Sequence, residues 1–165
     1  MNKEFIIPDN LKLPGLKAIF TTRSNGDRDD PLKGLNLSFK GGIDRESVIE
    51  NRSAVASFFG IPLNSLVLPV QKHTDKVYII ESPLDDLSIE ADAIITNLES
   101  VILGVLVADC APILVYNPEK KVAAAVHAGW RGTASGIVNH PALKGGASNF
   151  QICLLPLDGG GLRWR

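Results

Sequence analysis

Apolar side chains recur along the chain at two spacings, which predict one long helix and several short strands. Residues 45–60, RESVIENRSAVASFFG, carry apolar side chains at 48, 49, 55, 58 and 59 and end in glycine. This spacing is typical of an amphipathic helix, and Asp44 is a suitable N-cap with Ser47 just inside. Short apolar runs predict strands at 16–23, 65–71, 76–82, 91–97 and 101–109.

Three regions of the second half have patterns of their own. Residues 101–109, VILGVLVAD, are apolar almost throughout, which is typical of a central strand buried on both faces. Residues 132–139, GTASGIVN, are expected to begin a helix. Residues 139–165 combine Gly and Pro clusters with no sustained period, so we expect an atypical tail without regular elements, disordered in part.

A hairpin is predicted between these regions. Apolar runs at 113–116 and 122–126 flank the sequence Asn117-Pro118-Glu119-Lys120. This sequence is typical of a type I β-turn, because Asn suits the first position and Pro fixes φ at the second. Two β-prone runs around such a turn indicate a β-hairpin.

The expected register of this hairpin brings two metal-binding side chains together. With the turn centred between Pro118 and Glu119, residues whose numbers sum to 237 face each other. Cys110 and His127 meet this condition, so we expect them opposite one another and within reach of one ion. A bulge at Pro112 would shift this pairing by one position.

Composition and charge narrow the classes of function. The 165 residues suffice for one domain with a real core, and 45% of them are apolar and 21% charged, as in ordinary globular proteins. A net charge of −1 without a basic block gives nucleic-acid binding no electrostatic support. No apolar run is long enough to cross a bilayer, and the first residues lack a signal-peptide core, so no membrane partner is expected. Two distant cysteines do not make a disulfide scaffold, so we expect a reducing, cytoplasmic setting.

Three side chains form the candidate metal site. His73, Cys110 and His127 would supply three ligands and leave a fourth position for water, the pattern of a catalytic zinc site. Such an ion lowers the pKa of bound water and polarises an acceptor oxygen. The alternatives are a small buried cysteine beside hydrogen-bonded histidines, or a Cys–His nucleophile pair.

The sequence HAGWRG, which follows the hairpin, also has two interpretations. Trp130 and Arg131 are either packing and a surface charge or parts of a site. The glycines at 129 and 132 favour a tight turn that holds the backbone close to something.

Several motifs together resemble one known family. They are TTRSNGD with LNLS, NR at 51–52, VQKHTDKV, ADAIITN, GVLVADCAPILVYNP and AAVHAGWRGTASGIV, in order between about residues 18 and 138. The chain is identified by them as a member of the YfiH-like family, also called the laccase-domain or multicopper polyphenol oxidase family. The paired ADC and HAGWRG elements are highly specific.

The resemblance implies a fold and a metal. The fold is an α+β sandwich of the α/β/β/α type, with mixed sheets and flanking helices. A single ion, usually zinc, is held by the His of the Q-x-H element, the Cys of ADC and the His of HAGWRG, which are His73, Cys110 and His127 here. One Cys and two His suit copper as well.

The resemblance also implies the reaction. Family members are described as purine nucleoside phosphorylases for adenosine, inosine and methylthioadenosine, with adenosine deaminase activity. Other descriptions are copper-dependent polyphenol oxidase and peptidoglycan-editing factor. Three histidines in all are too few for the trinuclear centre of a multicopper oxidase, so we rank purine nucleoside chemistry above oxidation.

Two departures from the family pattern qualify this expectation. Thr74 stands where the family has Gly after the Q-x-H histidine. After Val138 the sequence no longer follows the family, so we expect residues 1–138 to form the YfiH-like part, incomplete at its C-terminus. An inactive metal-binding remnant, or a chain that associates with itself to cover its sheet, is therefore an alternative.

The expected substrates are a purine nucleoside and phosphate, and further residues are candidates to act on them. For deamination, activated water would attack C6 of adenine, and Asp109 or a nearby acid would move protons as a catalytic group. For phosphorolysis, phosphate would attack the ribose C1′, held by Arg52, Arg131 or Arg23. Asn36 is a candidate for a polar substrate contact.

Overall fold

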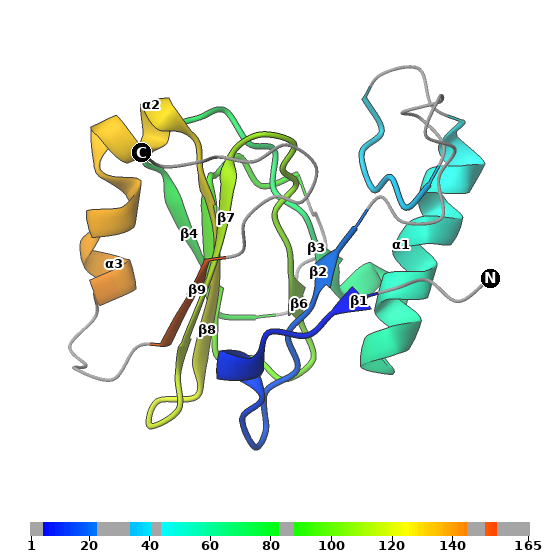
Figure 1. The fold of residues 1–165 in the computed structure, drawn as a ribbon, viewed down its shortest axis with the longest axis horizontal. Helices are drawn as coiled ribbons and strands as arrows, with labels where there is room; N and C mark the ends of the chain where they lie inside the picture. The colour runs from blue at the N-terminus through cyan, green and yellow to red at the C-terminus, as the bar shows by residue number, and fades with distance from the viewer. Residues whose placement is uncertain (1–4, 23–33, 41–43, 83–87, 145–150, 155–165) are drawn as a thin grey trace. The chain divides into compact units, whose positions relative to one another are not determined.

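The computed structural model describes residues 5–22, 34–40, 44–82, 88–144 and 151–154 (Figure 1). The chain divides into two compact units, Met1–Asn64 and Ser65–Arg165, called here the N-terminal and C-terminal units. Among the described residues, no helix has the length and apolar character that crossing a membrane requires.

The predicted helix is the main element of the N-terminal unit. Helix α1 spans Arg45–Phe59, and the backbone N–H of Ser47 donates to the Asp44 carboxylate over 2.9 Å. Gly60 ends the helix in the left-handed conformation, with φ of 77°. The N-cap and the stop signal are thus confirmed.

Short elements complete this unit. Strands β1 (Phe5–Ile6) and β2 (Phe20–Thr21) pair antiparallel, and a 3₁₀ turn, η1, spans Asp9–Leu11. The strand predicted at 16–23 is therefore confirmed only at its centre, because β1 offers it two partners and no more.

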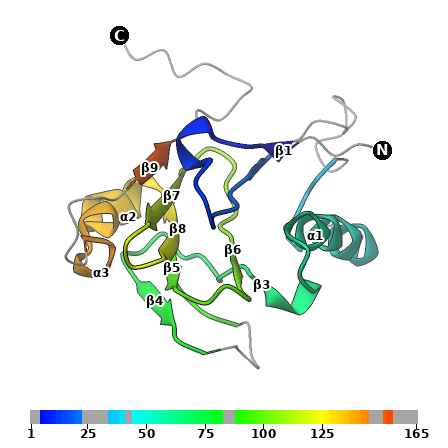
Figure 2. The same cartoon turned by 90° about the horizontal axis from the view of Figure 1, so that it is seen from below.

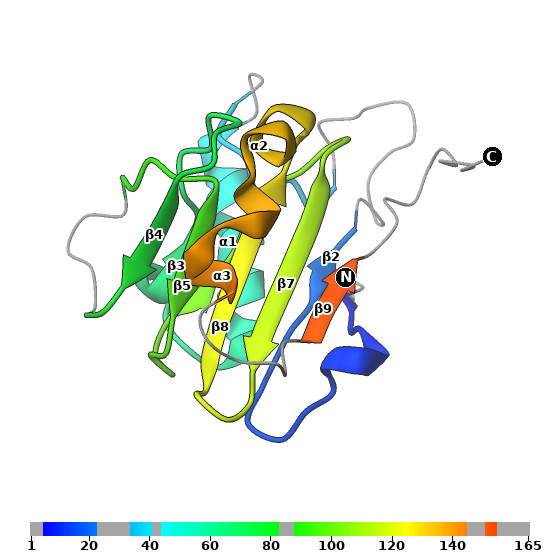
Figure 3. The ribbon, with the colours of Figure 1, turned by 90° about the vertical axis from the view of Figure 1, so that its left-hand side faces the viewer.

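A mixed five-stranded sheet forms the middle of the C-terminal unit. Its order is β4-β5-β8-β7-β9, which Figure 3 shows from one side. The β4–β5 pair is parallel and the other pairs are antiparallel. The strands are β4 (Val77–Ile80), β5 (Ala93–Thr96), β7 (Ala111–Asn117), β8 (Val122–Ala128) and β9 (Gln151–Leu154).

Both faces of this sheet are covered (Figure 2). On one face lie α2 (Trp130–Ser135), η3 (Ile137–Asn139) and α3 (Pro141–Lys144), and Ile137 and Leu143 pack there against β5, β7 and β8. On the other face lies the parallel pair of β3 (Leu66–Val67) and β6 (Ile102–Leu103). The short 3₁₀ turn η2 (Leu63–Ser65) precedes β3 in the chain. Residues of β3 and β6 share a second core cluster with Ile94 and Ala125. The mixed sheets with few helices confirm the α+β class.

The prediction of a central strand at 101–109 is wrong. Only Ile102 and Leu103 form a strand, and Leu103 and Val105 pack onto the second core from outside the large sheet. The central strand is β8, whose small alanines 123–125 allow layers on both faces to approach closely.

The predicted hairpin is confirmed, but its register differs by two. Asn117 pairs with Val122, so the partner numbers sum to 239 and His127 faces Pro112. The loop has four residues because the Asn117 side-chain oxygen accepts from the N–H groups of Glu119 and Lys120, at 3.0 and 2.9 Å. Lys121 then closes the loop with φ of 52°.

The region after the hairpin is more regular than the sequence indicated. The helix expected at 132–139 begins earlier, at Trp130, and stops where Gly136 turns left-handed with φ of 99°. The expectation of no regular element in 139–165 is wrong for α3 and for β9, which pairs antiparallel with the free edge of β7. The remainder of that tail lies outside the described residues.

Candidate metal centre

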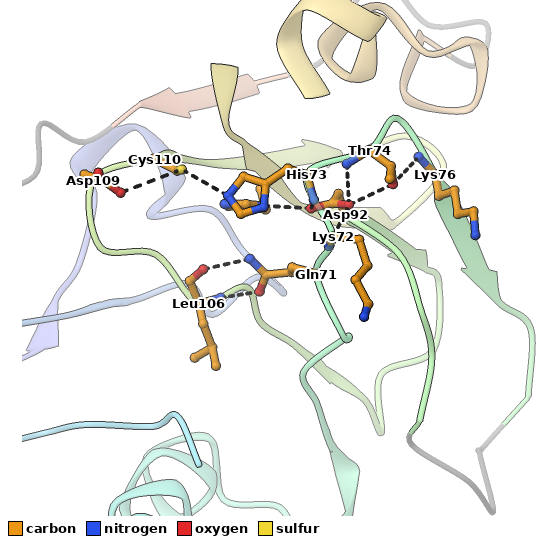
Figure 4. Close-up of polar contacts among 10 residues, drawn as sticks. Gln71, Lys72, His73, Thr74, Lys76, Asp92, Leu106, Asp109 and Cys110 are labelled. Atoms are coloured by element: carbon orange, nitrogen blue, oxygen red, sulfur yellow. Dashed lines mark hydrogen bonds and ion pairs between the residues drawn. The ribbon is translucent and has the colours of Figure 1, made fainter. Parts of the chain in front are cut away.

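Three donor side chains meet at one end of the β7–β8 hairpin. Figure 4 shows two of them, His73 and Cys110, with their side chains pointing toward each other. His73 comes from the loop between β3 and β4, Cys110 directly precedes β7, and His127 lies near the end of β8. Their donor atoms all lie within 4.8 Å of one another. Nε2 of His73 is 3.9 Å from Sγ of Cys110.

These separations fit a single ion. Bonds of about 2.0–2.3 Å at tetrahedral angles bring ligand atoms to roughly 3.4–3.7 Å from each other. The donor atoms here are about one ångström wider at most, which is within the reach of side-chain rotation. The predicted ligand set therefore converges in space, and the residues fit a metal such as zinc or copper.

A buried carboxylate organises the centre. Asp92 is fully buried, and its Oδ1 lies 2.8 Å from Nδ1 of His127, which is itself 3% exposed. Asp92 also accepts hydrogen bonds from the backbone N–H groups of Lys72, His73 and Thr74 and from the Thr74 hydroxyl. Burial by itself raises the pKa of Asp92, but the hydrogen bonds from His127, Thr74 and Lys72 outweigh it and lower the pKa to about 2.

The loop that carries His73 is held at a second point. The amide of Gln71 donates to the carbonyl of Leu106 over 2.7 Å and accepts from its N–H over 2.8 Å. His73 itself is exposed and has φ of 62°, an uncommon conformation for a residue with a side chain. These contacts hold the His73 loop beside the segment that leads to Cys110.

The two glycines of HAGWRG allow close packing, as their positions suggested. A Cβ at Gly129 would lie 2.8 Å from Cδ2 of His73, 3.2 Å from Sγ of Cys110 and 3.6 Å from Cε1 of His127. A Cβ at Gly132 would lie 2.6 Å from the carbonyl oxygen of Thr74. Any larger residue at 129 would therefore enter the candidate metal centre.

The environment of Cys110 does not favour a nucleophile. Burial raises the pKa of its thiol, and the negative charges of Asp109 and Asp92 raise it further. Activated cysteines have the opposite shift, because the thiolate is the attacking species. Asp109, the candidate for proton transfer, is exposed, and its Oδ1 lies 4.0 Å from Sγ of Cys110.

Arg131 belongs to the same unit as the three donors. It is exposed on α2, two residues after Gly129, and its guanidinium lies 5.1 Å from the ring centre of Trp130. Trp130 is 75% exposed, so the interpretation of this tryptophan as core packing is wrong.

The remaining substrate candidates have local roles in the N-terminal unit. Nε and Nη2 of Arg52 donate to the carbonyl of Leu37, at 2.9 and 2.7 Å, and its guanidinium lies 4.1 Å from the ring centre of Phe39. The side-chain oxygen of Asn36 accepts from the N–H of Ser38 over 2.8 Å. Their contact with a substrate stays a prediction, and Arg23 lies outside the described residues.

Asp92, Thr74 and Gln71 were missed as parts of the centre. Asp92 stands at the start of ADAIITN, where an acid before a strand suggests a solvated boundary. The available signal was an acidic residue within an apolar run of a chain that also has candidate metal-binding histidines. Such histidines commonly donate their second ring N–H to a carboxylate. Thr74 donates its hydroxyl to Asp92 over 2.8 Å, a bond that the glycine expected here from the family resemblance could not make.

The chain is similar in sequence to one known protein family and to two named enzymes. Residues 17–146 match the family described as multi-copper polyphenol oxidoreductase laccase. A purine nucleoside phosphorylase of Corynebacterium glutamicum is 38% identical over 125 residues, which are 74% of this chain and 51% of that protein. Adenosine deaminase RL5, from an unknown prokaryotic organism, is 34% identical over 131 residues, 74% of this chain and 50% of its own. The chain spans about half the length of the curated relatives it matches.

Two solved structures are similar to this chain in fold. YfiH of Bacillus licheniformis superimposes with a TM-score of 0.71 at 27% identity, over 82% of this chain and 56% of that one. YlmD of Geobacillus stearothermophilus gives a TM-score of 0.69 at 29% identity, over 79% and 50%. With a shared fold and a match to more than three quarters of its length, the chain belongs to the laccase-like YfiH family of multi-copper polyphenol oxidoreductases.

Proposed function

We propose that this chain carries the metal centre of a purine nucleoside phosphorylase that also deaminates adenosine. The convergence of His73, Cys110 and His127 carries the proposal, because it brings three donor atoms within reach of one ion. Catalytic zinc sites have three protein ligands and take water or substrate as the fourth. Relatives named purine nucleoside phosphorylase and adenosine deaminase support the choice of substrate. The substrates proposed are adenosine, inosine or methylthioadenosine, with phosphate.

Zinc is the proposed resident ion. One thiolate and two imidazoles are a borderline-soft donor set, which suits zinc and also accommodates copper. Bound there, the ion would supply Lewis-acid polarisation of a substrate oxygen or an activated water. Cys110 and both histidines would hold it.

The chain's own residues would do the rest of the chemistry. The exposed side of His73 leaves the centre open to a substrate. Asp109, exposed beside Cys110, would move protons to or from the purine base of the substrate. Arg131 would hold phosphate through its planar guanidinium.

The experiment measures metal content and turnover on the same preparation. Purified protein is expected to carry close to one zinc per chain, and Cys110→Ala to lose most of it. Inosine or adenosine with phosphate should give free base and ribose 1-phosphate. Arg131→Ala should raise the KM for phosphate while zinc content stays unchanged.

Other results select the alternatives. Copper-dependent oxidation of catechols without nucleoside turnover would favour the polyphenol oxidase that the family description names. Full zinc occupancy without any turnover, beside an active Corynebacterium glutamicum relative, would identify a metal-binding protein without this activity.

A further inference from the structure

We propose that Asp92 is the positioning residue of the metal centre, and that its one carboxylate sets both histidines before an ion binds. The inference rests on the proposed metal-dependent function. It goes beyond that function by assigning a role to a residue outside the ligand set.

Oδ1 of Asp92 holds the two histidines in different ways. It accepts from the backbone N–H of His73 over 2.9 Å and lies 2.8 Å from the ring Nδ1 of His127. One oxygen therefore links the loop-borne ligand and the strand-borne ligand. A shift of this oxygen would move both.

Oδ2 of Asp92 faces further donors. The N–H of Thr74 and the Thr74 hydroxyl each lie 2.8 Å away, and the N–H of Lys72 lies 3.2 Å away. With donors on both oxygens, the carboxylate acts only as an acceptor. Nδ1 of His127 therefore carries the proton, and Nε2 presents its lone pair to an ion.

Three successive backbone N–H groups, from Lys72 to Thr74, point at this carboxylate (Figure 4). Such an arrangement is possible because His73 takes a left-handed conformation, with φ of 62°. That conformation costs of the order of 1–2 kcal/mol in a residue with a side chain. The hydrogen bonds to Asp92 offset the cost, so the carboxylate determines the path of the loop.

Backbone hydrogen bonds and burial hold Asp92 itself in place. The backbone N–H of Asp92 donates to the carbonyl of Lys76 over 3.0 Å, and its carbonyl accepts from the N–H of His127 over 2.7 Å. The side chain is 0% exposed. Asp92 thus transmits the fixed position of the sheet to both ligands.

An amide at this position cannot meet the same donors. With the amide oxygen toward His127, the amide nitrogen faces the N–H groups of Lys72 and Thr74. With the nitrogen toward His127, it faces the N–H of His73, and His127 must carry its proton on Nε2. The first orientation disturbs the loop on both sides of His73, and the second disturbs both histidines.

The test compares Asp92→Asn with Asp75→Asn, the same change at an exposed aspartate of the same loop. Zinc affinity is measured by competition with a chelator, and site geometry by the absorption spectrum of the Co²⁺ form. Asp92→Asn is expected to weaken zinc binding by about 10–100-fold and to alter the Co²⁺ bands. Asp75→Asn should change the affinity by about twofold at most.

Three further measurements separate positioning from stability. Ile94→Val removes one methyl group from the buried neighbouring strand, and it should lower stability without changing zinc affinity. In ion-free wild-type protein, ¹⁵N NMR should find the proton of His127 on Nδ1. Thr74→Val, which removes one hydroxyl donor, should weaken zinc binding by a few-fold.

Wild-type zinc affinity and an unchanged Co²⁺ spectrum in folded Asp92→Asn would overturn the inference. A His127 proton on Nε2 in the wild type would overturn it as well, and that result needs neither a variant nor an ion. If the wild type binds no zinc while His127 has its proton on Nδ1, the proposed function fails but the arrangement around Asp92 stands.

Discussion

Asp92 holds the two histidines of the centre in different ways, one through its ring and the other through its backbone. His127 lies on the central strand β8, is buried, and is oriented through its ring by Asp92. His73 lies on an exposed loop, and Asp92 holds it through its backbone N–H. The ring of His127 is hydrogen-bonded to a buried carboxylate, whereas the ring of His73 contacts Sγ of Cys110 at 3.9 Å and packs edge-to-face with the His127 ring.

This difference shows how a small site combines precision with access. The sheet fixes the position of the ring of His127, the ligand on a strand. This requires the burial of a polar group, which must then have a hydrogen-bond partner. The loop-borne ligand stays open to solvent, where a substrate can approach. We expect substitutions at the two histidines to have the same effect on metal binding and different effects on stability.

The largest effect is expected from replacing each histidine by alanine. Both His127→Ala and His73→Ala should lose most bound zinc. His127→Ala should also lower the free energy of unfolding by about 2–4 kcal/mol, because it leaves a cavity and removes a partner from buried Asp92. His73→Ala should cost less than about 1 kcal/mol. Urea unfolding of the ion-free proteins measures this, and equal losses would contradict the comparison.

The next effect is expected at Gly129, where an added Cβ would meet all three candidate ligands. Gly129→Ala places a methyl group 2.8 Å from the His73 ring and 3.2 Å from Sγ of Cys110, so the ligands must separate. Zinc affinity should fall by more than about tenfold. Gly60→Ala is the control, because its Cβ meets open space although φ is 77°. It should destabilise by about 1 kcal/mol and leave zinc affinity unchanged.

A smaller effect is expected from pH on the ion-free protein. The pKa of Asp92 is about 2 in the folded chain, against an ordinary value of 3.8. A lowered folded pKa stabilises the fold above about pH 4, and this contribution, about 2 kcal/mol, is lost as pH falls toward 2. Unfolding free energies across this range should fall less steeply in Asp92→Asn. Parallel curves for the two proteins would show that Asp92 does not contribute.

The smallest effect is expected from loosening the exposed loop alone. Gln71→Ala removes both hydrogen bonds to Leu106, which hold the His73 loop beside the Cys110 segment. Zinc binding should weaken by roughly three- to tenfold, and stability by about 1 kcal/mol. Gln71→Glu keeps the acceptor but not the donor. Its zinc affinity and stability should lie between those of the wild type and those of Gln71→Ala. A loss confined to stability would mean that the loop-borne ligand does not depend on this contact.

Local signals in the sequence predicted the elements with strong ends. Asp44 and Gly60 define α1 because capping and the left-handed stop depend on adjacent residues. The hairpin and the meeting of Cys110 with His127 survived an error in register. A shift of two residues keeps every side chain on the same face of the sheet, whereas a shift of one would have reversed it.

Features that depend on distant parts of the chain were not predictable in the same way. The run at 101–109 is apolar enough for a central strand, but β8 takes that place because its alanines fit between two layers. β9 forms because β7 has a free edge, which a local pattern cannot reveal. Asp92 acquires its role only when the loop at 72–74 folds over it.

The length of the hairpin makes the far end of the sheet a practical attachment point. Seven residues of β7, at about 3.3 Å each, separate the turn at Pro118–Lys121 from the ligand end by roughly 20 Å. All four turn residues are exposed. A fluorophore or a surface tether placed on this turn would leave the ligands untouched and remain within energy-transfer range of a coloured ion such as Co²⁺. Metal loading could then be followed optically on single, immobilised molecules.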